Sequence, residues 1–131
     1  MNILNRLLMK KIIILDGATG TNLLYKRLLP GEPPAILNLK NPNAVYELQR
    51  EYIDEGSDVI LTNTFSANPI NFKSDKYKQV IRIGVRIACR AAGKRAMVFG
   101  DVGPLGIMIK PYGDAEFEEV YKIYYEIFKT F

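Results

Sequence analysis

Three short segments of this 131-residue chain combine glycines with polar side chains that could bind a charged ligand. They are residues 16–21 (Asp-Gly-Ala-Thr-Gly-Thr), 62–65 (Thr-Asn-Thr-Phe) and 100–104 (Gly-Asp-Val-Gly-Pro), and each directly follows an apolar run. A carboxylate such as Asp16 or Asp101 could hold an ammonium group, while a glycine turn exposes backbone N–H groups that suit a carboxylate or a phosphate. Each segment therefore has the composition of a strand-to-helix corner at which a ligand could bind.

Structural roles could explain the same residues. Asp16 could cap the helix that follows it, since Asp is a common N-cap residue. Asn63 and Thr64 could belong to a hydrogen-bonded turn, as could Asn68 shortly after them. Asp101 lies so close to a Gly-Pro pair that stabilising this turn is its favoured role. The residue types alone leave a ligand site and a set of local turns as open alternatives.

Alternating strands and helices are needed to position these corners. Apolar, β-rich composition predicts strands at residues 12–15, 58–62 and 96–100. Helical spacing predicts helices over 19–29, from the Asn41 cap and Pro42 up to Gly56, over 80–91 up to Gly93, and from an Asp114 cap through Phe117 to Phe128. Proline, glycine and polar residues predict loops at 30–34, 66–75 and 105–113.

The predicted order, β-α-α-β-α-β-α, indicates an α/β fold with parallel strands and right-handed helical crossovers. An open doubly wound sheet and part of a (β/α)8 TIM barrel both fit this order. Polar residues at the carboxyl end of all three predicted strands favour the barrel. Since a whole barrel needs about 200 residues or more, the chain is expected to supply its first three strands and to be incomplete.

Composition excludes several kinds of chemistry. The chain is 48% hydrophobic, which is enough for a core, and it contains one cysteine and no histidine. An intrachain disulfide, a Cys/His zinc cluster built from this chain alone and histidine acid–base catalysis are therefore excluded. Cys89 is expected to be a small buried hydrophobe, not a reactive thiol. No apolar run approaches the ~20 residues of a membrane span and no signal peptide is recognisable, so a cytoplasmic location is expected.

The positive charge of the chain is concentrated in one segment. The net charge is +4, but residues 73–95 hold eight basic residues and a single acid, Asp75. Arg82, Arg86 and Arg90 repeat every four residues and are expected to line one helix face. Stacking aromatics and nucleic-acid or nucleotide motifs are missing, which favours a solvated helix face over a nucleic-acid site.

Taken together, four segments resemble the homocysteine S-methyltransferase family, and within it the homocysteine-binding barrel of bacterial cobalamin-dependent methionine synthases. They are residues 15–21, Asn38-Leu39 with Pro42, residues 52–65 and residues 99–104, and they occur in the family's order. The resemblance covers nearly the whole chain from about residue 12 onward. Because the motifs of all three corners occur together in this order, the resemblance is more specific than any one motif would make it.

The resemblance implies a (β/α)8 barrel in which zinc, held by cysteine thiolates of later strands, binds the sulfur of homocysteine. The thiolate then takes a methyl group to give methionine, from methylcobalamin in the methionine synthase branch and from betaine or S-methylmethionine in other relatives. The backbone of the first corner, with Gly17, Ala18 and Gly20, and the Asp16 carboxylate would hold the amino-acid end of homocysteine. Asn63 and Thr64 would line the pocket, and Asp101 is a further candidate substrate-binding residue.

The chain also departs from the family's pattern. The family's later-strand cysteines, including a Gly-Gly-Cys-Cys signature, have no counterpart up to Phe131, so these residues are expected to form no zinc site and no catalytic residue is assigned. Residues 35–37 (Ala-Ile-Leu) stand where many relatives carry Glu before the Asn-Leu pair, and Gln49 stands where His is common. These changes put local contacts in doubt and leave the three corners intact.

Two functional hypotheses follow. The first is the amino-acid-binding front part of a zinc-dependent homocysteine S-methyltransferase that is inactive alone and whose remainder is missing, split off or encoded separately. A C-terminal complementing chain is then a candidate partner. The second is a non-catalytic truncated fragment, which is either a scaffold that pairs through the open edge of its third strand or a chain that never folds stably. The apolar residues 97–99 at this edge invite pairing with another chain. The last helix carries apolar residues on several sides, which predicts self-association if no partner covers them.

Overall fold

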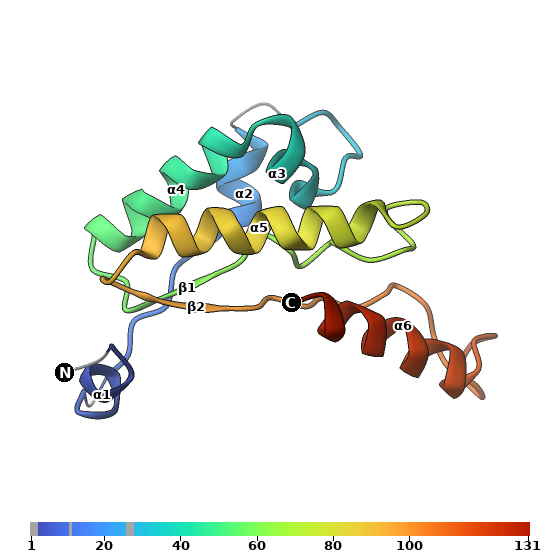
Figure 1. Cartoon of the computed structure of the whole chain (residues 1–131). Helices are drawn as coiled ribbons and strands as arrows, with labels where there is room; N and C mark the ends of the chain where they lie inside the picture. Colours follow the sequence, from blue (N-terminus) through green and yellow to red (C-terminus); the bar gives the residue numbers. More distant parts are fainter. Residues whose placement is uncertain (1–2, 11, 26–27) are drawn as a thin grey trace.

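The computed structural model describes residues 3–10, 12–25 and 28–131. Its elements are, in chain order, α1 (Ile3–Leu8), α2 (Thr19–Leu24), the 3-10 helix η1 (Pro34–Ile36), α3 (Leu37–Lys40), α4 (Pro42–Asp54), β1 (Val59–Leu61), α5 (Lys76–Ala92), β2 (Met97–Phe99) and α6 (Phe117–Thr130). Figure 1 shows α2 to α5 gathered on one side of the two strands, with α1 and α6 toward the other side. Helices therefore cover one face of the strand pair.

The two strands pair in parallel, as the sequence predicts. Val59 is opposite Met97 and Leu61 is opposite Phe99, and α5 makes the crossover between the strands. Because the two strands run in the same direction, their carboxyl ends, and the polar residues that follow them, lie at the same edge of the sheet. This edge carries the second and third corners of the chain.

The predicted first strand is wrong as a regular strand, although its residues lie beside β1. One isolated parallel bridge joins Leu15 to Val59, and the amide of Asp58 donates to the carbonyl of Ile14 at 2.8 Å. Ile12 is 77% exposed and Ile14 is 53% exposed, so no packing layer holds this segment in an extended ladder. Strands β1 and β2 and the single bridge at Leu15 thus stand where the sequence predicts three strands.

Helix α5 joins the three parts of the core. Val80 and Ile81 pack in a cluster with Ile127 of α6, Ala88 and Ala91 pack around the β1 residue Ile60, and Ile87 packs against α4. These buried positions recur at helical spacing, as the sequence predicts. The central helix thereby ties α4 and α6 to the strand pair.

Helix ends are partly as predicted. Asn41 caps α4 by accepting a hydrogen bond from the Ala44 amide at 3.3 Å, and Pro42 is the first residue of the helix. The predicted Asp114 cap of the last helix is wrong, because Glu116 is the N-cap and exchanges bonds with Glu119 in a capping box.

The second predicted helix is also shorter than expected. Helix α2 spans Thr19–Leu24, whereas the predicted helix continued to residue 29, and residues 26–27 of that range lie outside the described part of the chain.

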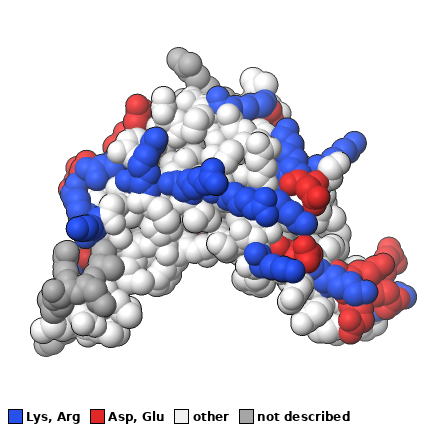
Figure 2. Space-filling view, viewed as in Figure 1, with Lys and Arg blue, Asp and Glu red and all other residues white. Residues whose placement is uncertain are grey.

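The outward face of α5 carries the predicted basic residues. Arg82, Arg86 and Arg90 are all exposed, and Figure 2 shows a band of Lys and Arg side chains running along this helix. Cys89 is exposed as well, so the prediction that it is buried is wrong. Its apolar sequence neighbours Ala88 and Ala91 point to the core, but position 89 lies on the arginine side of the same helix.

In the described ranges, no helix combines the length and the apolar character that a membrane crossing requires.

Candidate functional site

A pocket of about 190 Å³ lies at the carboxyl ends of β1 and β2. All three corners contribute to its walls, which are formed by Gly17, Thr19, Gly20, Pro34, Leu61, Thr62, Asn63, Phe65, Ser66 and Asp101. Parallel strands place their carboxyl ends at one sheet edge, which is where open α/β folds and barrels bind ligands. Four predicted site residues, Gly17, Gly20, Asn63 and Asp101, therefore share one pocket.

Asp16 is held by strand β1 and does not cap the following helix. Its Oδ2 accepts a hydrogen bond from the Leu61 amide at 3.0 Å. The N-cap of α2 is Ala18, which has no side-chain cap bond, so the capping alternative is wrong. Burial raises the pKa of the Asp16 carboxyl; the Leu61 N–H opposes this shift, and the nearby Asp101 charge adds to it. The third corner thus acts electrostatically on the first.

Asn63 presents its amide to the pocket in a fixed orientation. Its Nδ2 donates to Oδ1 of Asn38 at 3.0 Å and to the carbonyl of Pro34 at 3.1 Å. In return, Nδ2 of Asn38 donates to the carbonyl of Asn63 at 2.8 Å. Since an amide nitrogen has two hydrogens, both of those on Asn63 are used and its Oδ1 is the atom left for a ligand.

Thr62 and Thr64 join the second corner to the third. Thr64 Oγ1 donates to the backbone carbonyl of Asp101 at 2.7 Å, and the Asp101 amide donates to Thr62 Oγ1 at 3.0 Å. The two hydroxyl oxygens lie 2.6 Å apart. Thr64 is 2% exposed and is not among the residues that line the pocket. Its polar group is therefore directed at the protein backbone.

Asp101 lines the pocket, and no described residue donates a hydrogen bond to its carboxylate. Burial raises the pKa of this carboxyl. The expected role in stabilising the turn at Gly103-Pro104 is wrong for the side chain, because only the backbone of Asp101 is hydrogen-bonded. A half-buried carboxylate without a donor is a good acceptor for a cationic ligand.

The two glycines of the first corner differ in how tightly they are enclosed. A Cβ on Gly17 would lie 3.1 Å from Cε1 of Tyr52, whereas a Cβ on Gly20 would have only Pro34 Cγ within 4 Å, at 3.8 Å. Gly17 thus allows a close approach to α4, and Gly20 leaves open space in the pocket. Ala18, a third candidate of this corner, is not among the lining residues.

Several contributors to the site were not identified from the sequence. Asn38 was noted only in the family motif, yet it is 1% exposed and orients Asn63. Ser66, which accepts a bond from the Ala35 amide at 3.2 Å, closes the same wall. An Asn between two apolar residues of a short helix is the signal that could have found the first, because a buried amide needs specific partners.

The described residues do not fit a metal ion. No group of three His, Cys, Asp or Glu side chains with a suitable arrangement occurs in residues 3–10, 12–25 and 28–131. Cys89 is exposed on α5, away from the pocket walls. A thiolate zinc site needs four ligands, or three with one open position. The residues that the structure describes therefore support no step through zinc.

Comparisons with known proteins agree with this architecture. The chain is 29% identical over 135 residues to a methionine synthase of Mycobacterium leprae and 27% identical to that of Mycobacterium tuberculosis, with 91% of this chain and 11% of each relative covered. It is also similar to crystal structures of the Escherichia coli homocysteine methyltransferase MmuM. The metallated form matches with a TM-score of 0.65 at 26% identity, and the oxidized form matches with a TM-score of 0.66.

These matches cover only part of each relative. The alignments use 80% and 81% of this chain but 42% of the MmuM chain, so this chain spans less than half the length of the relatives that it matches. The sequence model of homocysteine S-methyltransferases matches residues 13–131, which is nearly the whole chain. The chain therefore belongs to the homocysteine S-methyltransferase family.

Proposed function

We propose that this chain holds the amino-acid end of homocysteine in a homocysteine S-methyltransferase that forms methionine. The observation that carries the proposal is the pocket in which Asp101 presents an unpartnered carboxylate close to the half-buried Asp16. A carboxyl group whose pKa is raised by burial gains most from a cation placed beside it, and the nearby charge of Asp16 adds to this attraction. The ammonium group of an amino acid has this charge.

The remaining walls suit the rest of such a ligand. Leu61, Pro34 and Phe65 offer apolar surface for methylene groups, and Asn63 offers an amide oxygen. Pockets for small molecules typically combine apolar walls with a few fixed polar groups. The pocket thus supports the binding part of the proposal, with Gly17, Gly20, Asn63 and Asp101 in its walls. The other three candidate residues, Asp16, Ala18 and Thr64, belong to the same corners but do not line it.

The chemical step requires groups that these residues do not provide. We infer that zinc and the methyl donor, methylcobalamin in the methionine synthase branch, are held by polypeptide other than these 131 residues. Zinc supplies Lewis acidity that favours the thiolate of homocysteine. The chain's own contribution is to bind and orient the amino-acid end, and it is expected to be inactive alone.

Calorimetric titration with three thiols tests the binding proposal. L-homocysteine carries both charged groups, 3-aminopropane-1-thiol lacks the carboxylate and 4-sulfanylbutanoate lacks the amine. Losing the amine should weaken binding about 10- to 100-fold, since a hydrogen bond to a charged group contributes about 1.5–3 kcal/mol. Tighter binding of 4-sulfanylbutanoate than of 3-aminopropane-1-thiol would contradict the proposal.

The substitution D101N gives the matching protein variant. It should remove most of the preference for the aminothiol, because the amide keeps the shape and loses the charge. D114N removes one exposed carboxylate that does not line the pocket and serves as the control. An equal loss of preference in both variants would mean that net charge, and not the pocket, selects the ligand.

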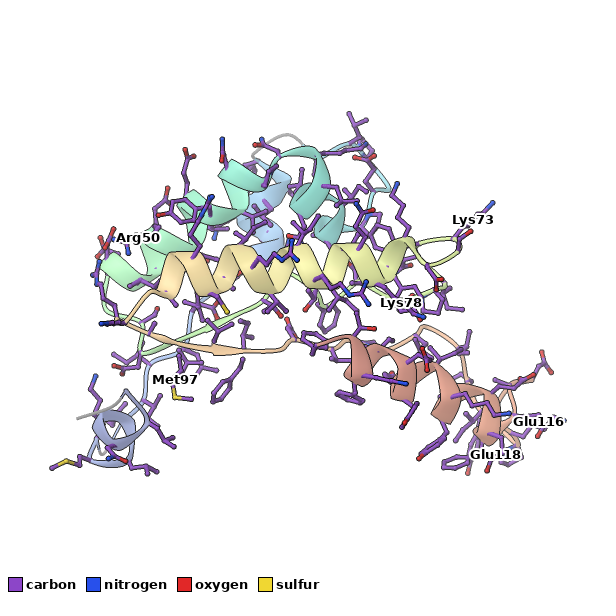
Figure 3. All side chains as sticks on the ribbon, viewed as in Figure 1. Arg50, Lys73, Lys78, Met97, Glu116 and Glu118 are labelled. Atoms are coloured by element: carbon purple, nitrogen blue, oxygen red, sulfur yellow. The ribbon has the colours of Figure 1, made fainter. Side chains whose placement is uncertain are left out.

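A second candidate function, a non-catalytic scaffold that associates through its sheet, rests on exposed apolar surface. Phe99 at the end of β2 is 47% exposed, and Figure 3 shows Met97 pointing to the side of the strands that α4 and α5 leave open. Light scattering after size-exclusion chromatography distinguishes the two. Association that F99E abolishes, together with no thiol binding, would favour the scaffold.

A further inference from the structure

The hydrogen atoms of the two threonine hydroxyls can be assigned by counting donors. A hydroxyl has one hydrogen, and that of Thr64 is directed to the Asp101 carbonyl at 2.7 Å. Thr62 must therefore donate to Thr64 across the 2.6 Å contact, while its oxygen accepts from the Asp101 amide at 3.0 Å. The three bonds form one closed ring with a single direction of donation.

This ring holds Asp101 at a place where the sheet no longer does. The strand register ends at Leu61 opposite Phe99, and the last ladder bond runs from the Thr62 amide to the Phe99 carbonyl at 2.9 Å. Asp101 lies two residues beyond Phe99, outside the strand pair. Side-chain hydroxyls thus bind the amide and the carbonyl that a longer ladder would have bound.

Hydrogen bonds to both the N–H and the C=O group of Asp101 hold its backbone, and so fix the position from which its side chain starts. The peptide groups on either side of the residue are held, so the carboxylate retains only its own side-chain rotations. The threonine side chains are 2% exposed, and no described residue donates to the carboxylate itself. The two threonines therefore fix where the Asp101 side chain begins, and they leave its carboxylate oxygens available to the pocket.

We propose that Thr64, with Thr62, is a positioning residue that aims the Asp101 carboxylate into the pocket and so sets the preference for a ligand with an amino group. This inference rests on the proposed function, because it concerns the same pocket. Thr64 does not line the pocket and acts only through Asp101. Thr62 does line it, and so contributes both to the ring and to the wall.

The test compares T64V, which removes the hydroxyl at nearly constant shape, with T64S, which keeps it. The first readout needs no ligand and is the NMR titration of the Asp101 side-chain carboxyl carbon. The second is the ratio of dissociation constants for 4-sulfanylbutanoate and 3-aminopropane-1-thiol. T64V should shift the Asp101 titration and lower this ratio about tenfold, roughly the effect of one hydrogen bond. T64S should remain close to the wild type in both.

T130V is the matched control. Thr130 Oγ1 donates to the Glu126 carbonyl at 2.7 Å, so this variant loses a hydroxyl-to-carbonyl bond of the same length on α6. It should leave both readouts unchanged. A folded T64V protein with the wild-type Asp101 titration and the wild-type ratio would overturn the proposal. So would equal changes in T64V and T130V.

A further measurement covers the case in which T64V does not fold. In the wild-type chain, the Thr64 hydroxyl proton should exchange slowly with water and show a scalar coupling to the Asp101 carbonyl carbon. A fast-exchanging proton without this coupling would overturn the proposal. If the wild type shows no preference for the aminothiol, the proposed function fails by itself, and the titrations still decide whether Thr64 positions Asp101.

Discussion

Asp16 lies beside the pocket and Asp101 lies in its wall, and their carboxylates differ in their hydrogen-bond partners. Asp16 is bound through its side chain, which accepts the Leu61 amide at 3.0 Å. Asp101 is bound through its backbone, which two threonine hydroxyls hold on both sides, while its carboxylate has no described donor. One carboxylate therefore completes the structure, and the other is available to a ligand.

This difference separates a carboxylate that is bonded to strand β1 from one that lines the pocket without a described donor. Burial raises the pKa of both carboxyls, so the pKa direction alone does not distinguish them. The hydrogen-bond partners do, because a carboxylate that already accepts a strand amide loses that bond if it turns to a ligand. The Asp101 carboxylate loses no hydrogen bond to a described residue when it turns to a ligand.

The largest expected effect comes from breaking the support of the third corner at Gly84. A Cβ at this position of α5 would lie 2.5 Å from Nδ2 of Asn38 and 2.9 Å from Cγ2 of Thr64. Asn38 Nδ2 already donates to the carbonyls of Asn63 and Val80, so it cannot move without losing them. G84A should lower the free energy of unfolding in urea by about 2–3 kcal/mol, although alanine favours a helix by up to about 1 kcal/mol.

Gly20 provides the control at the first corner. Its Cβ would have only Pro34 Cγ within 4 Å, at 3.8 Å, an ordinary contact distance. G20A should therefore leave the stability unchanged or raise it by up to about 1 kcal/mol, as alanine does in an unobstructed helix. Equal losses in G84A and G20A would show that the crowding at Gly84 is not what matters.

A smaller effect should distinguish the two carboxylates directly. D16A leaves the Leu61 amide without its acceptor and should lower the free energy of unfolding by about 1–2 kcal/mol. D101A removes a partly desolvated charge that no described donor compensates, and should change stability by less than about 0.5 kcal/mol or raise it. Urea titration of both variants measures this contrast. A greater loss in D101A than in D16A would reverse the comparison.

The sequence predicts the parts of the fold that depend on periodicity and local chemistry. Parallel pairing of the second and third strands, the start of α4 at Asn41-Pro42 and the buried face of α5 are confirmed. The prediction of a first strand is wrong because a run of four apolar residues indicates a strand that is buried by packing, whereas no described residue buries Ile12. The last helix is capped by Glu116 instead of Asp114 because Glu119 completes a capping box with Glu116, a spacing that could have been read from the sequence.

The site was predicted less completely than the fold, because the hydrogen-bond partners of its side chains are determined by tertiary contacts. Residue order brought Asp16, Asn63 and Asp101 into one candidate site, and the structure places the last two on one pocket wall. Spacing along the chain does not reveal that the Leu61 amide is available to Asp16, or that Thr64 faces the Asp101 backbone. Cys89 shows the same limit, since its apolar neighbours do not determine which way it faces.

The smallest expected effect is a pH dependence that sharpens the contrast between the corners. Burial raises the pKa of Asp101 above its ordinary value of 3.8, so the folded chain takes up this proton before the unfolded chain does. The stability of the wild type relative to D101N should therefore increase as the pH falls from neutral toward 3.8, and be lost again as the pH rises through the folded pKa. Urea titrations over this range give the difference in stability, and D114N reports the effect of losing an exposed carboxylate outside the pocket.

D101N also removes the charge that helps to raise the pKa of Asp16. The double variant D16N/D101N therefore completes a cycle in which the effects of the two substitutions on stability should not be additive. A difference that decreases with falling pH would mean that a hydrogen bond to the Asp101 carboxylate outweighs its burial, and that both corners hold their carboxylates in the same way.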